Sequence, residues 1–208
     1  MTDNTGSSSL QLRLARITSL LLSPPLVALV AVGLFAFLSP IGTGLLFSWQ
    51  SFLLGLFFVV IGPVLPLSTM VILGRITFDV KNRRDRPLLY FAAILVYSTG
   101  AFIAWLYLNY AMMVIAIAYA GVTTAIALIS LFWKVSAHSA GVAGPLTGLI
   151  WVFGVILLPF MSLVGLVAWA RWREGLHNVA QLVVGILTAI LVTAGVYWFL
   201  WGAPLFIL

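Results

Sequence analysis

Residues 171–185, RWREGLHNVAQLVVG, decide both how the chain folds and where its polar chemistry lies. This stretch places the guanidinium of Arg171 and the imidazole of His177 between apolar segments that belong in a lipid bilayer. Charged side chains at membrane depth are costly unless they face a protein interior or a water-filled cavity. We therefore expect Arg171 and His177 to form part of a binding site inside a membrane-embedded bundle.

The composition of the 208-residue chain is that of an integral membrane protein. Hydrophobic residues make up 63% of the chain, charged residues make up 7%, and the mean hydropathy is +1.22, whereas soluble domains contain roughly 25% charged residues. The net charge is +6. Because the basic residues fall in short loops, this charge indicates membrane orientation and anionic lipid head groups, not nucleic acid. The chain has no cysteine, which excludes disulfides and thiolate chemistry.

Long apolar runs predict an all-α fold, a polytopic membrane helix bundle of about seven transmembrane helices, with six as the alternative. We expect the polar residues 1–12 to form a disordered cytoplasmic lead and residues 13–208 to form a single transmembrane domain. About 20 residues cross roughly 30 Å of hydrocarbon at 1.5 Å per residue. The predicted helices cover residues 17–38, 46–74, 88–108, 112–133, 139–157, 159–172 and 178–201.

The apolar stretch between His138 and Arg171 fits either one long helix or two short ones, and the charges favour two. If the chain turns near Leu158 and Pro159, every charged residue and both histidines lie on one side of the membrane. The turns on the opposite side then carry no charge. By the positive-inside rule, we expect the charged loops and the N-terminus to be cytoplasmic, at a prokaryotic plasma membrane.

Three polar clusters, residues 79–87, 136–138 and 171–177, lie beside predicted helix ends on the charged side. Ser136 is suited to cap the helix that follows it and is expected to contact the bound phosphate, and His177 precedes the last helix. The N–H groups and positive dipole ends of two helices can therefore aim at a common point. This arrangement predicts a site for an anion.

The side chains of these clusters suit phosphate in particular. Arg86 and Arg171, with Arg83 or Arg84, carry planar guanidinium groups that match phosphate oxygens. Two histidines near a phosphate can supply a nucleophile and a general acid. The sequence contains no P-loop, no HExxH motif and no Ser-His-Asp elbow, so these arginines and histidines are the candidate site.

These residues resemble the type 2 phosphatidic acid phosphatase (PAP2) superfamily. The pattern of that family has three parts, in the order Lys-x6-Arg-Pro, Pro-Ser-Gly-His and Ser-Arg-x5-His-x3-Asp. The third part is matched here by Ala170-Arg171-x5-His177-x3-Gln181, followed by Gly185 where the family commonly has a glycine.

The other two parts of the pattern are matched more loosely. Ser136-Ala-His138 stands for the second part, and Arg86-Pro87 stands for the end of the first, with Asp79 at the position of the lysine. The order of the three parts and their one-sided topology agree with the family.

The resemblance covers about residues 75–190 and implies a membrane enzyme that hydrolyses a polyprenyl phosphate or diphosphate, or a glycerophospholipid phosphate. It implies that His177 attacks phosphorus to give a phosphohistidine. His138 would then protonate the leaving lipid alcohol and later activate water, while Arg86 and Arg171 hold the phosphoryl oxygens. No metal or other cofactor is implied, and the partners are the lipid phosphate and the surrounding membrane lipids.

Two positions depart from the family pattern. Gln181 replaces the aspartate that accepts a hydrogen bond from the nucleophilic histidine; it lies one helical turn after His177 and reaches the ring, but it is neutral. Asp79 replaces the lysine. It either pairs with Arg83, so that Lys81 takes over the phosphate contact, or binds a cation.

Two other functions are compatible with the sequence. One is a magnesium-dependent prenyl or phosphoalcohol transferase with Asp79 and Asp85 as metal ligands. The other is a non-catalytic PAP2-like protein that binds lipid and has lost activation, which the neutral Gln181 would explain.

Overall fold

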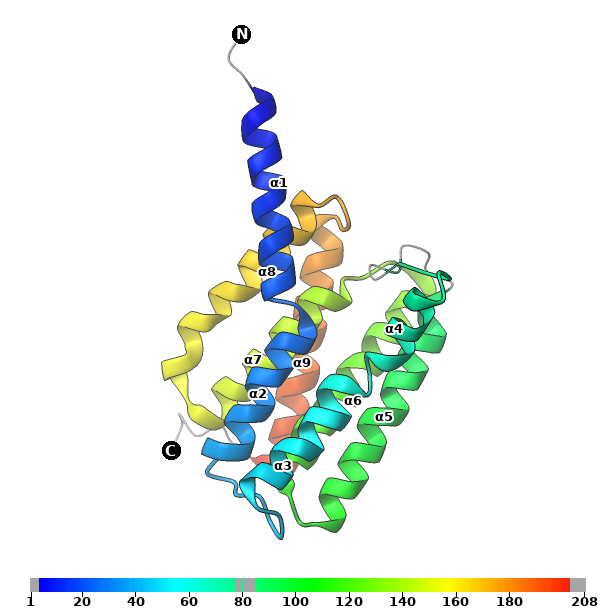
Figure 1. The fold of residues 1–208 in the computed structure, drawn as a ribbon. Helices are drawn as coiled ribbons and strands as arrows, with labels where there is room; N and C mark the ends of the chain where they lie inside the picture. The colour runs from blue at the N-terminus through cyan, green and yellow to red at the C-terminus, as the bar shows by residue number, and fades with distance from the viewer. Residues whose placement is uncertain (1–3, 78–79, 81–84, 203–208) are drawn as a thin grey trace.

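The computed structural model describes residues 4–77, 80 and 85–202, with side chains from residue 9 onward, and its regular structure there is entirely helical (Figure 1). Six of its helices are long and apolar enough to cross a membrane. The chain is therefore a polytopic helix bundle, as the composition predicted. The six are Ser9–Leu38, Ser48–Ile72, Arg86–Leu106, Tyr110–Phe132, Val155–Arg173 and Val179–Trp201.

Three of these long helices are built from two or three shorter elements. The α-helices are α1 (Asn4–Leu21), α2 (Pro24–Leu38), α3 (Ser48–Gly55), α4 (Leu65–Ile72), α5 (Arg86–Leu106), α6 (Tyr110–Phe132), α7 (Ala137–Phe153), α8 (Ser162–Arg173) and α9 (Val179–Trp201). A π-helical segment, Leu56–Ile61, follows α3 and leads toward α4. A 3-10 helix, Val155–Met161, precedes α8.

Residues 4–12, the described part of the predicted disordered lead over residues 1–12, differ from that prediction. From Asn4 onward the chain is already helical, and α1 continues to Leu21. The helix docks along α8, and the Gln11 side chain accepts a hydrogen bond from Arg173. Polarity alone predicted a frayed end, but residues farther along α1, such as Ala15 and Ser19, are buried, and the helix extends outward from them (Figure 1).

Prolines separate the paired elements of the first two long helices. Pro24 is the first residue of α2, where its missing N–H costs no intrahelical hydrogen bond. The π-helical segment and Pro63 interrupt the second long helix before α4 begins at Leu65. Each of these two long helices is therefore interrupted at a proline, which lacks the N–H for an intrahelical hydrogen bond and whose ring clashes with the preceding turn.

The stretch between His138 and Arg171 forms two helices, as the charge distribution predicted, but the chain turns earlier than expected. The turn lies at Gly154, whose φ of +87° is a conformation that favours glycine, and not near residues 158–159. Pro159 lies inside the 3-10 helix that leads into α8.

The connections between helices gather at two ends of the bundle (Figure 1). The end of α4, the start of α5 and the connections joining α6 to α7 and α8 to α9 lie at the end from which α1 projects. The turns after α2, α5 and α7 lie at the other end and contain no charged residue. The clusters 136–138 and 171–177, and Arg86 from the first cluster, therefore belong to one end of the molecule.

Helix α7 lies at the centre of the bundle, and the second polar cluster, residues 136–138, lies at its N-terminal end. It packs against α2, α6, α8 and α9, and residues on several of its faces are buried. Its start is fixed against α9, because the N–H of Ser136 donates a hydrogen bond to the carbonyl of Gln181 at 3.1 Å. Gly185 permits this contact, since a Cβ there would lie 2.6 Å from the Ser136 carbonyl oxygen.

We expect Gly185→Ala to lower the free energy of unfolding by about 1–3 kcal/mol, because the added methyl group meets a backbone atom that cannot rotate away. Thermal unfolding in detergent micelles measures the change. Gly195→Ala is the matched control, because it lies on the same helix and its Cβ would meet no atom within 4 Å. Equal Tm values for the two variants would contradict the close approach of α7 and α9.

Candidate functional site

A cavity of about 600 Å³ lies inside the charged end of the bundle and brings together the four principal candidates. His138, His177, Arg86 and Arg171 all line it, although they come from three separate segments of the sequence. Its volume falls within the range of small-molecule binding sites, about 300–1,000 Å³.

The wall of this cavity is polar at one end and apolar over most of its area. Glu174 and Ser19 join the four candidates at the polar end. Tyrosines, aliphatic residues and prolines from α2, α4, α5, α6, α7 and α9 line most of the remainder, among them Tyr97, Ile126 and Tyr197. The cavity therefore suits a ligand that has an anionic group attached to an apolar body.

His177 lies immediately before α9 and is held by the capping residues of that helix. Its Nδ1 is 3.2 Å from Oε1 of Gln181, so the predicted contact across one helical turn is confirmed. The N–H of Asn178 donates to the same oxygen at 3.2 Å, which identifies that atom as the carbonyl oxygen of the amide. Because this oxygen only accepts, Nδ1 carries the proton and Nε2 keeps its lone pair.

The surroundings of His177 favour its neutral form. Burial is the largest cause that lowers the pKa of its imidazole, and the charge of Lys134 is the next. The hydrogen bond to Gln181 acts in the opposite direction, while Arg171 and Arg86 lower the pKa further, to about 4. At neutral pH the Nε2 lone pair is therefore available for reaction.

Arg171 lies in the last turn of α8 and is 7% exposed. Its Nη1 donates to the hydroxyl oxygen of Ser19 at 3.0 Å and to Oε2 of Glu174 at 3.2 Å. The carboxylate and the hydroxyl stabilise the guanidinium within a largely apolar region.

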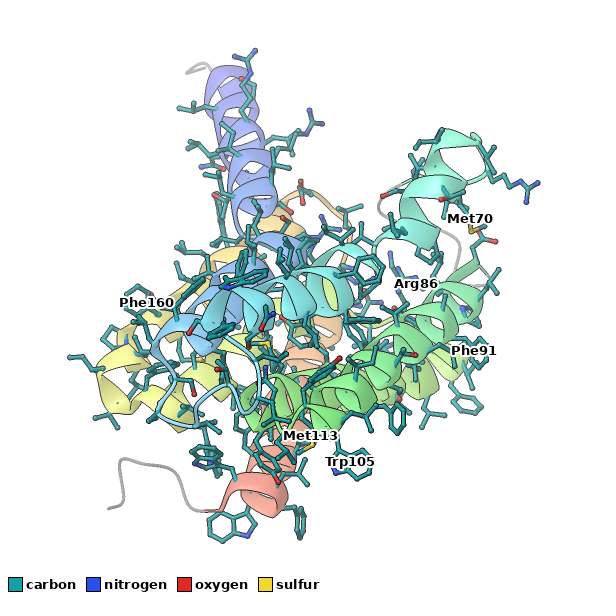
Figure 2. The ribbon with its side chains drawn as sticks, turned by 60° about the horizontal axis from the view of Figure 1, so that its bottom comes forward. Met70, Arg86, Phe91, Trp105, Met113 and Phe160 are labelled. Atoms are coloured by element: carbon teal, nitrogen blue, oxygen red, sulfur yellow. The ribbon has the colours of Figure 1, made fainter. Side chains whose placement is uncertain are left out.

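Arg86 is the first residue of α5 and is 6% exposed. Figure 2 shows it turned toward the interior of the bundle, whereas Phe91 and Trp105 of the same helix point outward. Its Nε donates to the carbonyl of Val80 and its Nη1 to the carbonyl of Val135, both at 3.2 Å. Arg86 thereby connects the chain before α5 to the chain before α7.

His138 lies in the first turn of α7, and its Nε2 is 3.1 Å from the carbonyl oxygen of Ser19. A carbonyl oxygen only accepts, so Nε2 carries a proton in this contact.

Ser136 has the role that the sequence predicted at the helix end but lies off the cavity wall. Its Oγ accepts a hydrogen bond from the N–H of Ser139 at 3.3 Å, which confirms it as the N-cap of α7. It is fully buried and is not among the residues that line the cavity. Ser136 therefore orients α7, and the expected phosphate contact is not part of this geometry.

Four of the residues predicted for the site lie outside the described residues: Asp79, Lys81, Arg83 and its alternative Arg84. Within the part of the chain that the structure describes, no group of three or more His, Cys, Asp or Glu side chains could hold a metal ion.

Three residues of the site were missed from the sequence. Ser19 is separated from Arg171 by 152 positions, and no local pattern connects them. Glu174 follows Arg171 by three positions, a helical spacing that could have indicated the pair. Lys134 donates a hydrogen bond to the carbonyl of Leu176 at 2.7 Å, so its charge lies beside His177.

No family model matches the chain, and comparisons with curated proteins and with solved structures also find no match. The function is therefore argued from the site itself.

We expect His177 to stay neutral from pH 7 down to about pH 5, because burial and the nearby cations lower its pKa to about 4. Imidazole NMR of histidine-labelled protein, with His177→Asn to assign the signal, measures the titration. Gln181→Glu preserves the length of the side chain and its accepting oxygen but adds a negative charge, so it should raise the pKa. A wild-type titration near 6.5 would contradict the buried, cation-flanked environment.

Proposed function

We propose that this protein is a PAP2-type membrane phosphatase that removes phosphate from a lipid through a phosphohistidine on His177. The observation that supports it most is the cavity shared by His138, His177, Arg86 and Arg171. The family pattern assigns phosphate chemistry to residues at these positions, and they meet at one polar end. In this proposal the PAP2-like core covers about residues 75–190.

The apolar part of the cavity supports a lipid as the substrate. A phosphate group can lie against the two arginines while the first part of its hydrocarbon chain contacts Tyr97, Ile126 and Tyr197. A polyprenyl phosphate or diphosphate and a glycerophospholipid phosphate both have this shape.

The first chemical step begins at the Nε2 lone pair of His177. Nε2 forms a bond to phosphorus as the bond to the lipid oxygen breaks, and the protonated His138 gives its proton to that leaving oxygen. Arg86 and Arg171 stabilise the charge on the phosphoryl oxygens.

The second step returns the enzyme to its starting state. A water oxygen attacks phosphorus, His138 takes a proton from that water, and the bond between nitrogen and phosphorus breaks. Phosphate leaves, and His177 regains its lone pair. None of these bond changes requires a metal ion.

The proposed enzyme has seven transmembrane helices: the six long ones and, in addition, α7. This helix has 17 residues, which corresponds to roughly 25 Å, slightly less than the hydrocarbon thickness. The charged end and the N-terminus face the cytoplasm at a prokaryotic plasma membrane.

A second candidate function is lipid-phosphate binding without turnover. It is favoured by the neutral Gln181 beside His177, where the family has a carboxylate, and by Glu174, which already engages Arg171. A magnesium-dependent transferase would use Asp79 and Asp85, and Asp79 lies outside the described residues.

We expect purified protein to release phosphate from at least one lipid phosphate and to form an acid-labile phosphoenzyme. His177→Ala should abolish both, because it removes the nucleophile. His138→Ala should lower the rate by about 10²–10⁴ while still forming the phosphoenzyme, because the proton donor is lost. Chelation of divalent cations should leave the rate unchanged.

The matched pair for the arginine is Arg171→Lys and Arg173→Lys. The first should raise KM because lysine cannot replace the planar fork. The second should have no effect, since Arg173 contacts Gln11 and Trp172 outside the cavity. Lipid binding without release in every assay would favour the second candidate, and activity that requires magnesium would favour the transferase.

A further inference from the structure

We infer that Ser19, on the N-terminal helix α1, is a positioning residue for both the phosphate-binding arginine and the second histidine of the site. This inference rests on the proposed function, because it assigns Ser19 a role in the same phosphate site. It extends the site beyond the segment that resembles the PAP2 pattern, since α1 precedes that segment by more than one long helix.

Ser19 contacts two functional groups through two different atoms. Its hydroxyl oxygen accepts a hydrogen bond from Nη1 of Arg171 at 3.0 Å. Its main-chain carbonyl oxygen lies 3.1 Å from Nε2 of His138. One residue therefore fixes the direction of the guanidinium and the proton position on the imidazole.

The location of Ser19 supports a role in the site. Its side chain is 5% exposed, although it belongs to a helix whose other faces are largely exposed, and it lines the cavity. Its carbonyl is one of the last in α1, where the helix ends at Leu21 and no longer uses all of its acceptors. The break before Pro24 thus leaves a carbonyl that can accept from His138.

The contact with Arg171 has a defined consequence for phosphate binding. Nη1 is shared between the neutral hydroxyl of Ser19 and the carboxylate of Glu174. The hydroxyl adds a second acceptor without adding negative charge, so it orients the guanidinium without repelling a phosphate. Removing it loses a hydrogen bond to a charged group and leaves the guanidinium less well directed.

Substitutions at Ser19 separate its two contacts. Ser19→Ala removes the hydroxyl but keeps the main-chain carbonyl, so only the contact with Arg171 is lost. Ser19→Thr restores a hydroxyl at the same position. Ser130→Ala is the matched control, because it also removes a buried serine hydroxyl but lies on α6 away from the cavity wall.

The first measurement is the binding of inorganic phosphate to the full-length protein in detergent. The rise in Tm with phosphate concentration reports the binding. We expect Ser19→Ala to weaken binding by about tenfold or more, as the loss of a hydrogen bond to a charged group implies. Ser19→Thr should recover most of the affinity, and Ser130→Ala should bind like the wild type. Combining Ser19→Ala with Arg171→Lys should add little to the effect of Arg171→Lys alone.

The second measurement is the hydrolysis of a lipid phosphate. Ser19→Ala should raise KM with a smaller change in kcat, because His138 keeps its carbonyl contact. Phosphate affinity and KM equal to the wild type in Ser19→Ala would overturn the inference while leaving the proposed function intact. Weaker phosphate binding in Ser19→Ala, in a protein that hydrolyses no lipid phosphate, would support the inference and contradict the proposed function. A wild-type protein that binds no phosphate would overturn both.

Discussion

The cost of burying a guanidinium in a membrane protein determines how this structure is assembled. Arg86 and Arg171 are 6% and 7% exposed, and each must find acceptors inside the bundle. Arg86 uses two main-chain carbonyls, while Arg171 uses the hydroxyl of Ser19 and the carboxylate of Glu174. Because these acceptors come from distant segments, satisfying the two cations joins α1, α5, α8 and the start of α7 around one cavity.

The same surroundings explain the state of the candidate nucleophile. His177 is buried beside cations and hydrogen-bonded to a neutral amide, so its imidazole is uncharged at neutral pH. The capping amide of Gln181 fixes the ring and its tautomer as a carboxylate would. In the proposed phosphatase, the neutral amide would stabilise less of the positive charge on a phosphorylated imidazole than a carboxylate. Gln181 would then orient the nucleophile without giving the intermediate the same electrostatic support.

Local patterns in the sequence predicted those features that depend on neighbours along the chain. The lengths of the apolar runs, the cap at Ser136 and the reach of Gln181 to His177 all follow from helical spacing. The position of the turn at Gly154 could not be predicted in this way, because Pro159, five residues later, is also typical of a turn. The contacts of Ser19 depend on how α1 docks against α7 and α8. The hydrophobic periodicity of a helix predicts which face is buried but does not identify the residues that cover it.

The balance of charge around the cavity bears on which anion it suits. Arg16, Arg86 and Arg171 line the wall and Lys134 lies beside His177, whereas Glu174 is the single carboxylate among the described residues of the wall. One carboxylate neutralises only part of this positive potential. A phosphate monoester or a diphosphate carries more than one negative charge, while a phosphodiester carries one. Since charged groups in a region of low dielectric constant are stable only when compensated, the polar end of the cavity suits a terminal phosphate better than a phosphodiester linkage.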